Sequence, residues 1–212
     1  MRAGLAALAA ACLAGCASLP APPPLAYGSA EGEAAQHNRA AALGLQAHAC
    51  DAPAWVMTGR FALSNGREGG SGNIEWTQGG GELRLLLSAP ITRQGWLLER
   101  NRAGITLSGG PQGPLQGDDA ARLLRDATGW DVPLDALGCW MRGIEADPAR
   151  FGPPRTGVGA DLLPRRIEQG GWVLEYDDWR IDPFSRQPMP HRINASRGED
   201  RVRVLVERWG LE

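Results

Sequence analysis

Lysine is absent from this chain of 212 residues: all 22 basic residues are arginine, and 24 acidic residues bring the formal net charge to −2. Nucleic-acid-binding surfaces carry an excess of basic residues, so this balance excludes nucleic acid as a partner. Histidine is also scarce, with three residues, and no spacing of histidine and cysteine matches a metal site. The histidines lie outside any nucleophile-elbow or metalloprotease motif, so we predict neither an enzyme nor a bound cofactor.

The chain also lacks an apolar run of the ~20 residues needed to cross a bilayer. Its N-terminus has instead a basic start at Arg2, a short apolar stretch from Ala3 to Leu13 and small residues before Cys16, an order typical of a secretory signal. The segment Leu13-Ala14-Gly15-Cys16 resembles the bacterial lipobox, which implies cleavage after Gly15 and acyl chains on Cys16. An ordinary signal with an incidental cysteine is the alternative. Ala17 replaces the aspartate that would resemble an inner-membrane retention signal, so we expect an outer-membrane anchor facing the periplasm.

The composition divides the chain into three parts: a signal peptide (1–15), a lipidated cysteine with a tether and helix (16–50), and one folded domain (51–212). The tether is rich in proline and alanine up to about Gly32 and is expected to be extended. Apolar residues at helical spacing predict a helix from Glu33 to Ala49. Together, the tether and the helix are expected to hold the folded domain at a distance on the order of tens of Å from the membrane.

From Trp55 onward, apolar residues alternate with polar ones in short runs separated by Gly-rich turns. This pattern predicts a meander of antiparallel strands with one buried face. Two helices interrupt it: one opens at Asp118 and ends at Gly129, and a second starts near Asp131 with Pro133 in its first turn. Residues 145–163 are expected to form a loop, after which strands resume from Arg165 to Trp209.

Two cysteines that remain after cleavage, Cys50 and Cys139, are suited to pairing in an oxidising periplasm. The sequence does not establish whether their Cα atoms approach closely enough, and two isolated thiols are the simpler interpretation.

The chain contains eight tryptophans, and Trp76, Trp96 and Trp172 share strand faces with aliphatic neighbours, which indicates core positions. A curved sheet covered by two amphipathic helices can also enclose an apolar cavity, and periodicity does not distinguish a filled core from a hollow one. If the domain is hollow, we expect its wall to include Trp76, Leu85, Leu87, Trp96, Leu98 and Trp140.

Most of the mature domain resembles the LolB family of outer-membrane lipoprotein receptors. The matching segments, in order, are Gly59-Arg60-Phe61, Ile74-Glu75-Trp76, Leu85–Pro90, Asp118-Asp119-Ala120, Gly129-Trp130, Val132-Pro133-Leu134, Leu163-Pro164-Arg165, Gln187-Pro188-Met189-Pro190 and the strand ending at Trp209. The chain departs from the family pattern at Pro90-Ile91-Thr92, where the family usually has Pro-Leu-Gly, and at Glu145, where it often has proline.

The resemblance implies a mainly β fold: a single antiparallel, unclosed β-barrel with two helices covering an apolar cavity. It further implies a receptor, expected to be monomeric, that binds the acyl chains of lipoproteins. A soluble periplasmic carrier, LolA, would deliver this cargo while the openings of the two cavities face each other. The receptor would then insert the cargo into the outer membrane without ATP. The apolar residue of the family's protruding loop, here Ile91, would touch the bilayer, whereas the sequence alone favours a cap that folds back on the strands. The alternative function is a structural or assembly lipoprotein of the envelope with a filled β core and a protein-binding surface.

Overall fold

The computed structural model describes residues 26–45, 49–51, 53–89, 94–111 and 113–210. The sites predicted at Cys16 and Ile91 therefore lie outside the described residues. Those that are described form one antiparallel 12-stranded sheet in the order β1-β8-β9-β10-β11-β12-β2-β3-β4-β5-β6-β7. The strands are β1 (Ala26–Tyr27), β2 (Trp55–Ser64), β3 (Gly69–Gly79), β4 (Glu82–Ala89), β5 (Gln94–Asn101), β6 (Gly104–Ser108), β7 (Leu115–Gly117), β8 (Arg155–Val158), β9 (Pro164–Gln169), β10 (Trp172–Ile181), β11 (Pro188–Arg197) and β12 (Asp200–Gly210).

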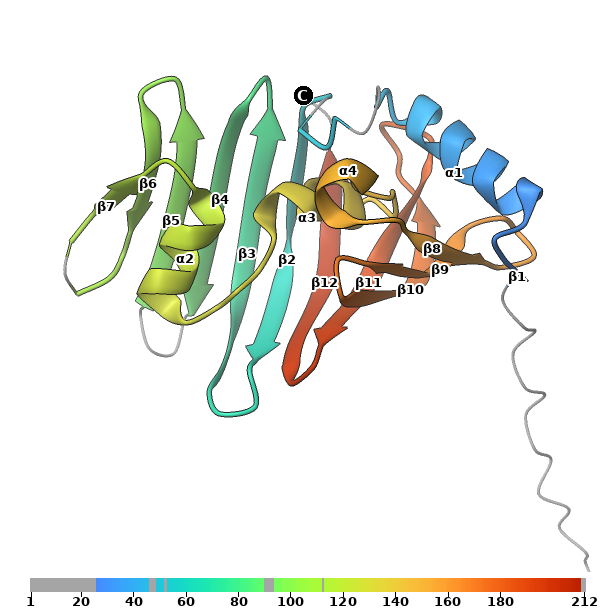
Figure 1. The fold of residues 1–212 in the computed structure, drawn as a ribbon. Helices are drawn as coiled ribbons and strands as arrows, with labels where there is room; N and C mark the ends of the chain where they lie inside the picture. Colours follow the sequence, from blue (N-terminus) through green and yellow to red (C-terminus); the bar gives the residue numbers. More distant parts are fainter. Residues whose placement is uncertain (1–25, 46–48, 52, 90–93, 112, 211–212) are drawn as a thin grey trace, which may run out of the picture.

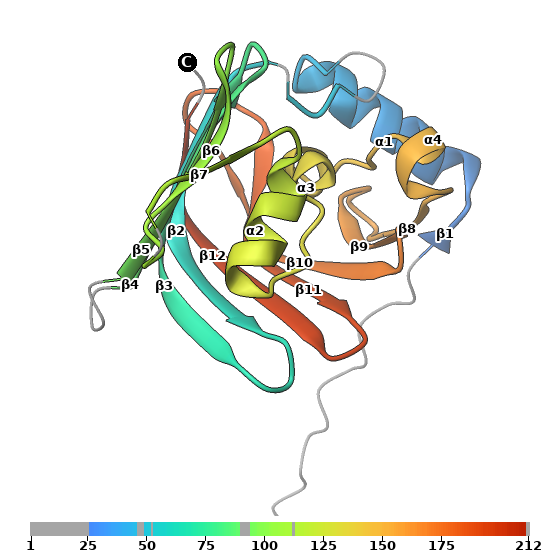
Figure 2. The ribbon, with the colours of Figure 1, turned by 60° about the vertical axis from the view of Figure 1, so that its left-hand side comes forward.

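The sheet curves around two helices, α2 (Ala120–Thr128) and α3 (Leu134–Trp140), which lie in its hollow (Figure 2). Its edges are β7 at one end and β1 at the other, and within the described part of the chain these edges do not pair with each other (Figure 1). The predicted antiparallel, unclosed barrel with covering helices is thus confirmed. Strands from the two halves of the chain meet in the middle of the sheet, because β12 pairs with β2.

The strand pattern read from the sequence reflects a real alternation of buried and exposed side chains. Along β3, Ile74, Trp76 and Gln78 are buried, while Glu75 between them is exposed. In β2, Gly59 lies opposite Val206, beside a bulge in β12, and a Cβ atom there would stand only 2.2 Å from the carbonyl oxygen of Leu205. Glycine at this position therefore allows the two strands to pack closely at the point where the sheet bends.

The helix boundaries follow local capping chemistry. The Asp119 side chain accepts a hydrogen bond from the Arg122 amide and caps α2, one residue later than the predicted start. Gly129 ends α2 in the left-handed conformation, at φ 74°, as predicted. Pro133 precedes α3 as its N-cap residue instead of lying within the first turn.

Two predictions for irregular and helical segments were wrong. Residues 145–163, expected to be a loop, contain the short helix α4 (Pro148–Phe151), capped by Asp147, and the strand β8, which pairs with both β1 and β9. Each of these elements is only four residues long, so its own residues show no periodic pattern. The N-terminal helix α1 runs from Ala30 to Ala42, not from Glu33 to Ala49, because Ser29 caps it earlier.

Candidate functional site

The inner face of the sheet and the two covering helices enclose an apolar cavity of about 260 Å³. Its lining comes from β2, β3, β4, β5 and β12 on one side and from the α2–α3 segment on the other. The lining residues are Phe61, Leu63, Glu68, Gly69, Gly70, Ser71, Ile74, Trp76, Leu85, Leu87, Ala89, Trp96, Leu124, Thr128, Trp130, Val132, Leu134, Leu137, Met141, Val202 and Val204. Glu68 is the one charged side chain in this set, so the cavity suits an apolar ligand.

The pairing register of β3, β4 and β5 determines which side chains form the sheet side of the cavity. Trp76 lies opposite Leu85, and Leu87 lies between Ile74 on β3 and Trp96 on β5, so alternate residues of three strands form one continuous apolar surface. The indole nitrogen of Trp76 donates a hydrogen bond to the side-chain oxygen of Gln78 at 3.0 Å. The wall therefore exposes no unsatisfied polar atom of Trp76 to a ligand.

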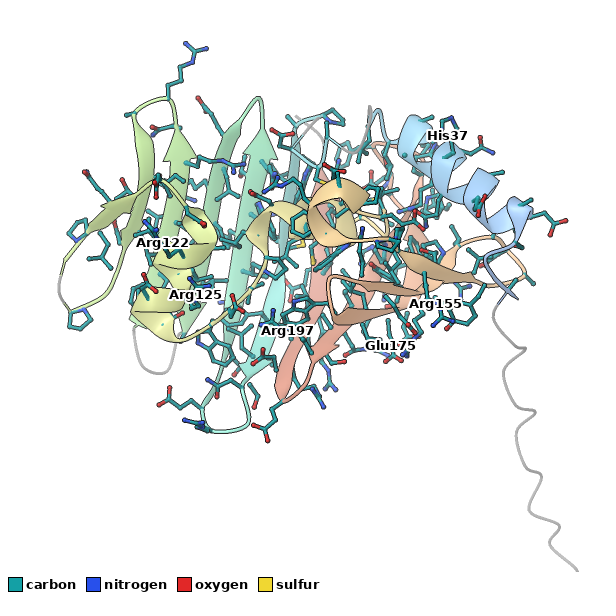
Figure 3. All side chains as sticks on the ribbon, viewed as in Figure 1. His37, Arg122, Arg125, Arg155, Glu175 and Arg197 are labelled. Atoms are coloured by element: carbon teal, nitrogen blue, oxygen red, sulfur yellow. A yellow bond between two sulfur atoms is a disulfide. The ribbon has the colours of Figure 1, made fainter. Side chains whose placement is uncertain are left out.

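The helical wall is amphipathic. Leu124 of α2 and Leu134 and Leu137 of α3 contribute to the lining, whereas Arg122 and Arg125 point away from the sheet into solvent (Figure 3). The Thr128 hydroxyl donates to the carbonyl oxygen of Leu124 at 2.6 Å, which satisfies its polarity at the cavity edge.

A salt bridge holds the connection between the two helices against the sheet. Arg197, in β11, binds the Asp131 carboxylate at 2.8 Å and the Asp131 carbonyl oxygen at 2.9 Å. Its guanidinium also lies 4.8 Å from the ring of Trp172. The helix pair is therefore held against the sheet from outside the cavity.

A disulfide joins Cys50 to Cys139 of α3, with Cα atoms 4.7 Å apart. The simpler interpretation of two isolated thiols was therefore wrong: the fold brings together residues 89 positions apart, a proximity that no local pattern encodes. Arg142, just after α3, reinforces this link by donating hydrogen bonds to the carbonyl oxygens of Gly138 and Cys50 at 2.9 and 2.8 Å. The C-terminal end of the cavity-lining helix α3 is thus fixed to the segment that precedes β2.

Helix α1 is docked on the body through buried polar contacts. Arg39 donates to the carbonyl oxygens of Arg142 and Pro188 at 2.9 and 2.8 Å, and its guanidinium lies 4.6 Å from the Trp179 ring. Burial lowers the pKa of Arg39 and of Arg142 to about 10, so both remain charged at neutral pH. The expectation that this helix lengthens the spacer is therefore wrong, because α1 packs against the domain.

Four of the six predicted wall residues, Trp76, Leu85, Leu87 and Trp96, lie in the cavity lining. Trp96 is half-buried, with its ring against Gly110, whereas Trp76 and Trp172 are buried in the core. The other two predicted residues, Leu98 and Trp140, are outside the lining.

Leu98 and Trp140 are each 1% exposed for different structural reasons. Leu98 lies between Leu85 and Leu107 in register, in the part of the sheet that α2 covers. Trp140 points into the core, where its indole nitrogen donates to the Gln169 side chain at 3.0 Å. Periodicity identifies the buried face but does not show which part of that face is filled.

The sequence reasoning missed several lining residues on β2 and on the helical side, namely Phe61, Trp130, Val132, Leu134, Leu137 and Met141. The available signal was the apolar face of the second predicted helix, which carries Leu134, Leu137 and Met141.

The described residues hold no group of three or more histidine, cysteine, aspartate or glutamate side chains that could bind a metal ion. His37 lies on α1 (Figure 3), and the Nδ1 atom of His191 is 2.8 Å from the Val206 carbonyl oxygen. Among the helices of the described part of the chain, none is both long and apolar enough to cross a membrane.

Comparison with known sequences shows strong similarity over nearly the whole chain. The family profile described as "Outer membrane lipoprotein LolB" matches residues 53–209. The chain is 37% identical over 213 residues to an outer-membrane lipoprotein LolB of Xanthomonas campestris pv. campestris, with 98% of this chain and 95% of that protein covered. It is 39% identical over 158 residues to the LolB of Xylella fastidiosa, with coverage of 74% and 71%.

Comparison with solved structures shows the same fold at low sequence identity. A DUF1329 family protein from Desulfovibrio piger matches with a TM-score of 0.52 and 8% identity, covering 87% of this chain and 94% of that chain. A LolA superfamily protein from Nitrosomonas europaea matches with a TM-score of 0.50 and 10% identity, covering 81% and 92%. At such identities the likeness concerns the fold alone.

Proposed function

Because the chain belongs to the LolB family of outer membrane lipoproteins, we propose that it receives acylated lipoproteins from a soluble LolA-type carrier and inserts them into the outer membrane without ATP. Family membership places the protein in the outer membrane, anchored by lipid and facing the periplasm. It also assigns the protein to the localisation of lipoproteins. The observation that supports the finer proposal is the apolar cavity between sheet and helices. The protein acts as a binding and transfer protein, with no catalytic step.

The energetics of acyl chains suit such a passive transfer. Burying hydrocarbon yields about 0.8 kcal/mol per CH₂ group, so a small difference in how much chain each site covers changes affinity by orders of magnitude. Cargo then moves downhill from carrier to receptor if the receptor cavity buries more of it, and from receptor to bilayer because the bilayer buries all of it. No nucleotide is needed for either step.

The full chain, reconstituted in liposomes, should take a radiolabelled lipoprotein from its complex with the carrier in a nucleotide-free buffer. Cargo that stays on the carrier, or moves only after ATP is added, would contradict the proposal.

A structural or assembly lipoprotein with a filled core is the second candidate function, and the cavity disfavours it. An environment-sensitive apolar dye should bind the native protein and be displaced by a fatty acid. A filled core predicts neither binding nor displacement.

We propose three parts for the chain: a signal peptide (1–15), a lipidated cysteine with its tether and N-terminal helix (16–50), and a lipoprotein-binding domain (51–212). Cys16 is the proposed acylation site, so Cys16→Ala should give a protein that incorporates no labelled palmitate. Incorporation of label into that variant would contradict the anchor assignment.

Ile91 is the proposed membrane contact during delivery, when its side chain would gain about 1.5–3 kcal/mol from burial in lipid. Ile91→Glu should accept cargo from the carrier but insert it poorly into liposomes, while Ile91→Leu should match the parent in both steps. A parental insertion rate for Ile91→Glu, or unfolding of that variant, would show that Ile91 has a different role.

A further inference from the structure

The turn between β10 and β11, residues 182–187, presents two large apolar side chains to solvent. Phe184 is 71% exposed and Ile181, the last residue of β10, is 63% exposed; of the large apolar side chains in the described residues, these two are the most exposed. Arg186 is exposed beside them and forms no salt bridge within the described part of the chain. Solvent-exposed aromatic and aliphatic groups next to a free guanidinium are typical of surfaces that bind at a lipid headgroup boundary.

This turn is rigid. Asp182 is buried, and one of its carboxylate oxygens accepts hydrogen bonds from the Phe184 amide, the Ser185 amide and the Ser185 hydroxyl. Arg39 of α1 donates to the carbonyl oxygen of Pro188, the residue with which β11 begins. A fold that constrains the turn in this way holds Phe184 outward, so its exposure is not explained by a loose loop.

The turn lies at the end of the sheet opposite the cavity mouth. Asp182 and Ser185 line a small pocket together with Trp55, which begins β2. At the other end of that strand, Gly69 and Gly70 are exposed and line the cavity, which opens there. We call these the closed end and the mouth end. Ten strand residues at about 3.3 Å each separate them by about 30 Å. In Figure 1 the mouth end carries the β2–β3 hairpin at the lower edge of the sheet.

The proposed anchor is long enough for the closed end to reach the membrane. From Cys16 to Ala26 there are ten residues, which span at most about 35 Å when extended. The 13 residues of α1 cover about 20 Å from there to the closed end, where Leu43 lies beside Asp182. A lipid on Cys16 therefore does not prevent the turn from lying on the same bilayer.

We propose that Phe184 and Ile181 dock the closed end on the phospholipid surface, and that this contact directs the cavity mouth away from the membrane. In this orientation the mouth is accessible to a soluble carrier in the periplasm. Delivery then requires the domain to turn over on its tether, so that the mouth end approaches the bilayer. The inference rests on the lipid anchor of the proposed function, but its test is independent of cargo.

The three phenylalanines of the chain provide the test, because each reports a different place: Phe184 on the turn, Phe61 in the cavity lining and Phe151 on α4, packed against Trp140. The full lipidated protein, biosynthetically labelled with 4-fluorophenylalanine, is reconstituted in vesicles of phosphatidylethanolamine and phosphatidylglycerol. A fraction of the lipid carries a spin label on its headgroup. Single Phe→Tyr variants assign the three ¹⁹F signals.

We expect severalfold greater paramagnetic broadening of the Phe184 signal than of the Phe151 signal, with Phe61 unaffected. An Ile181→Ser substitution should reduce the Phe184 broadening and leave the Phe151 chemical shift unchanged, which verifies the fold. Equal broadening at Phe184 and Phe151, or broadening of Phe61 in place of Phe184, would overturn the proposal. If cargo transfer fails while the Phe184 signal is still broadened, the proposed function is refuted and this inference stands.

Discussion

A larger side chain at residue 70, at the mouth of the cavity, distinguishes a binding cavity from an ordinary packing defect in the core. Gly70 lies on β3 among the lining residues, and a Cβ atom built there would contact nothing within 4 Å. Two residues along the same strand, a Cβ at Gly72 would stand 2.1 Å from the carbonyl oxygen of Ser88. Gly70→Leu therefore adds a side chain to open space, and we expect it to leave the free energy of unfolding within about 1 kcal/mol of the parent.

The effect on binding should be much larger than the effect on stability. The leucine side chain occupies space equivalent to about four CH₂ groups of a ligand chain, each worth about 0.8 kcal/mol when buried. Losing about 3 kcal/mol of burial corresponds to roughly a 200-fold increase in Kd for an acyl ligand. This value is an upper bound, since a flexible chain can shift within the cavity.

The assay is titration with a fluorescent fatty acid, in parallel with urea denaturation of the same samples. Asn73→Leu is the matched control, because it adds the same side chain to the exposed face of the same strand, outside the lining. Unchanged affinity in Gly70→Leu, or equal weakening in Asn73→Leu, would refute the assignment of the cavity as the binding site. A loss of stability as large as the loss of affinity would show that residue 70 meets a filled core.

Three further predictions concern the supports of the cavity. Reduction of the Cys50–Cys139 disulfide, which closes 89 residues, should lower the free energy of unfolding by up to about 4.6 kcal/mol in urea titrations with and without reductant; identical midpoints would contradict the pairing. Arg39→Met removes charged donors from the buried Arg142 carbonyl oxygen and the partly buried Pro188 carbonyl oxygen. It should cost about 3 kcal/mol and speed amide exchange in α1, whereas unaltered exchange would show that α1 docks by other contacts. Burial alone would raise the pKa of Asp135, but hydrogen bonds from Arg150 and Arg100 outweigh it and lower that pKa. Its contribution to stability is therefore complete above the pKa of unfolded aspartate and is lost as the pH falls through the lower folded pKa. With Asp135 41% exposed, Asp135→Asn should cost up to about 1 kcal/mol at pH 7 and progressively less as the pH falls toward 2, and a constant difference across that range would contradict the ion pairs.

Local patterns were sufficient wherever the chain's own chemistry defines an element. Alternating residues such as Leu83, Leu85 and Leu87 identified strands, and Gly129 identified the end of α2, since both signals depend on neighbours along the chain. The same reasoning placed Trp76 and Trp172 in the core correctly. It missed α4 and β8 because each is too short to show a period.

Contacts between distant segments decided the remaining features. The disulfide required Cys50 to meet α3, and the docking of α1 required Arg39 to reach carbonyl oxygens 103 and 149 residues away. The hollow itself depends on how far α2 and α3 stand from the sheet, a distance set by the Asp131–Arg197 bridge and the fixed end of α3.

The sequence by itself determined the antiparallel strands, the two covering helices and the apolar inner face, because side-chain periodicity dictates which face each element buries. Only the tertiary structure decided that Trp76, Leu85, Leu87 and Trp96 line the cavity while Leu98 and Trp140 pack against other side chains. The physical reason is that burial from water is a property of one face of an element, whereas a void is a property of the distance between two faces.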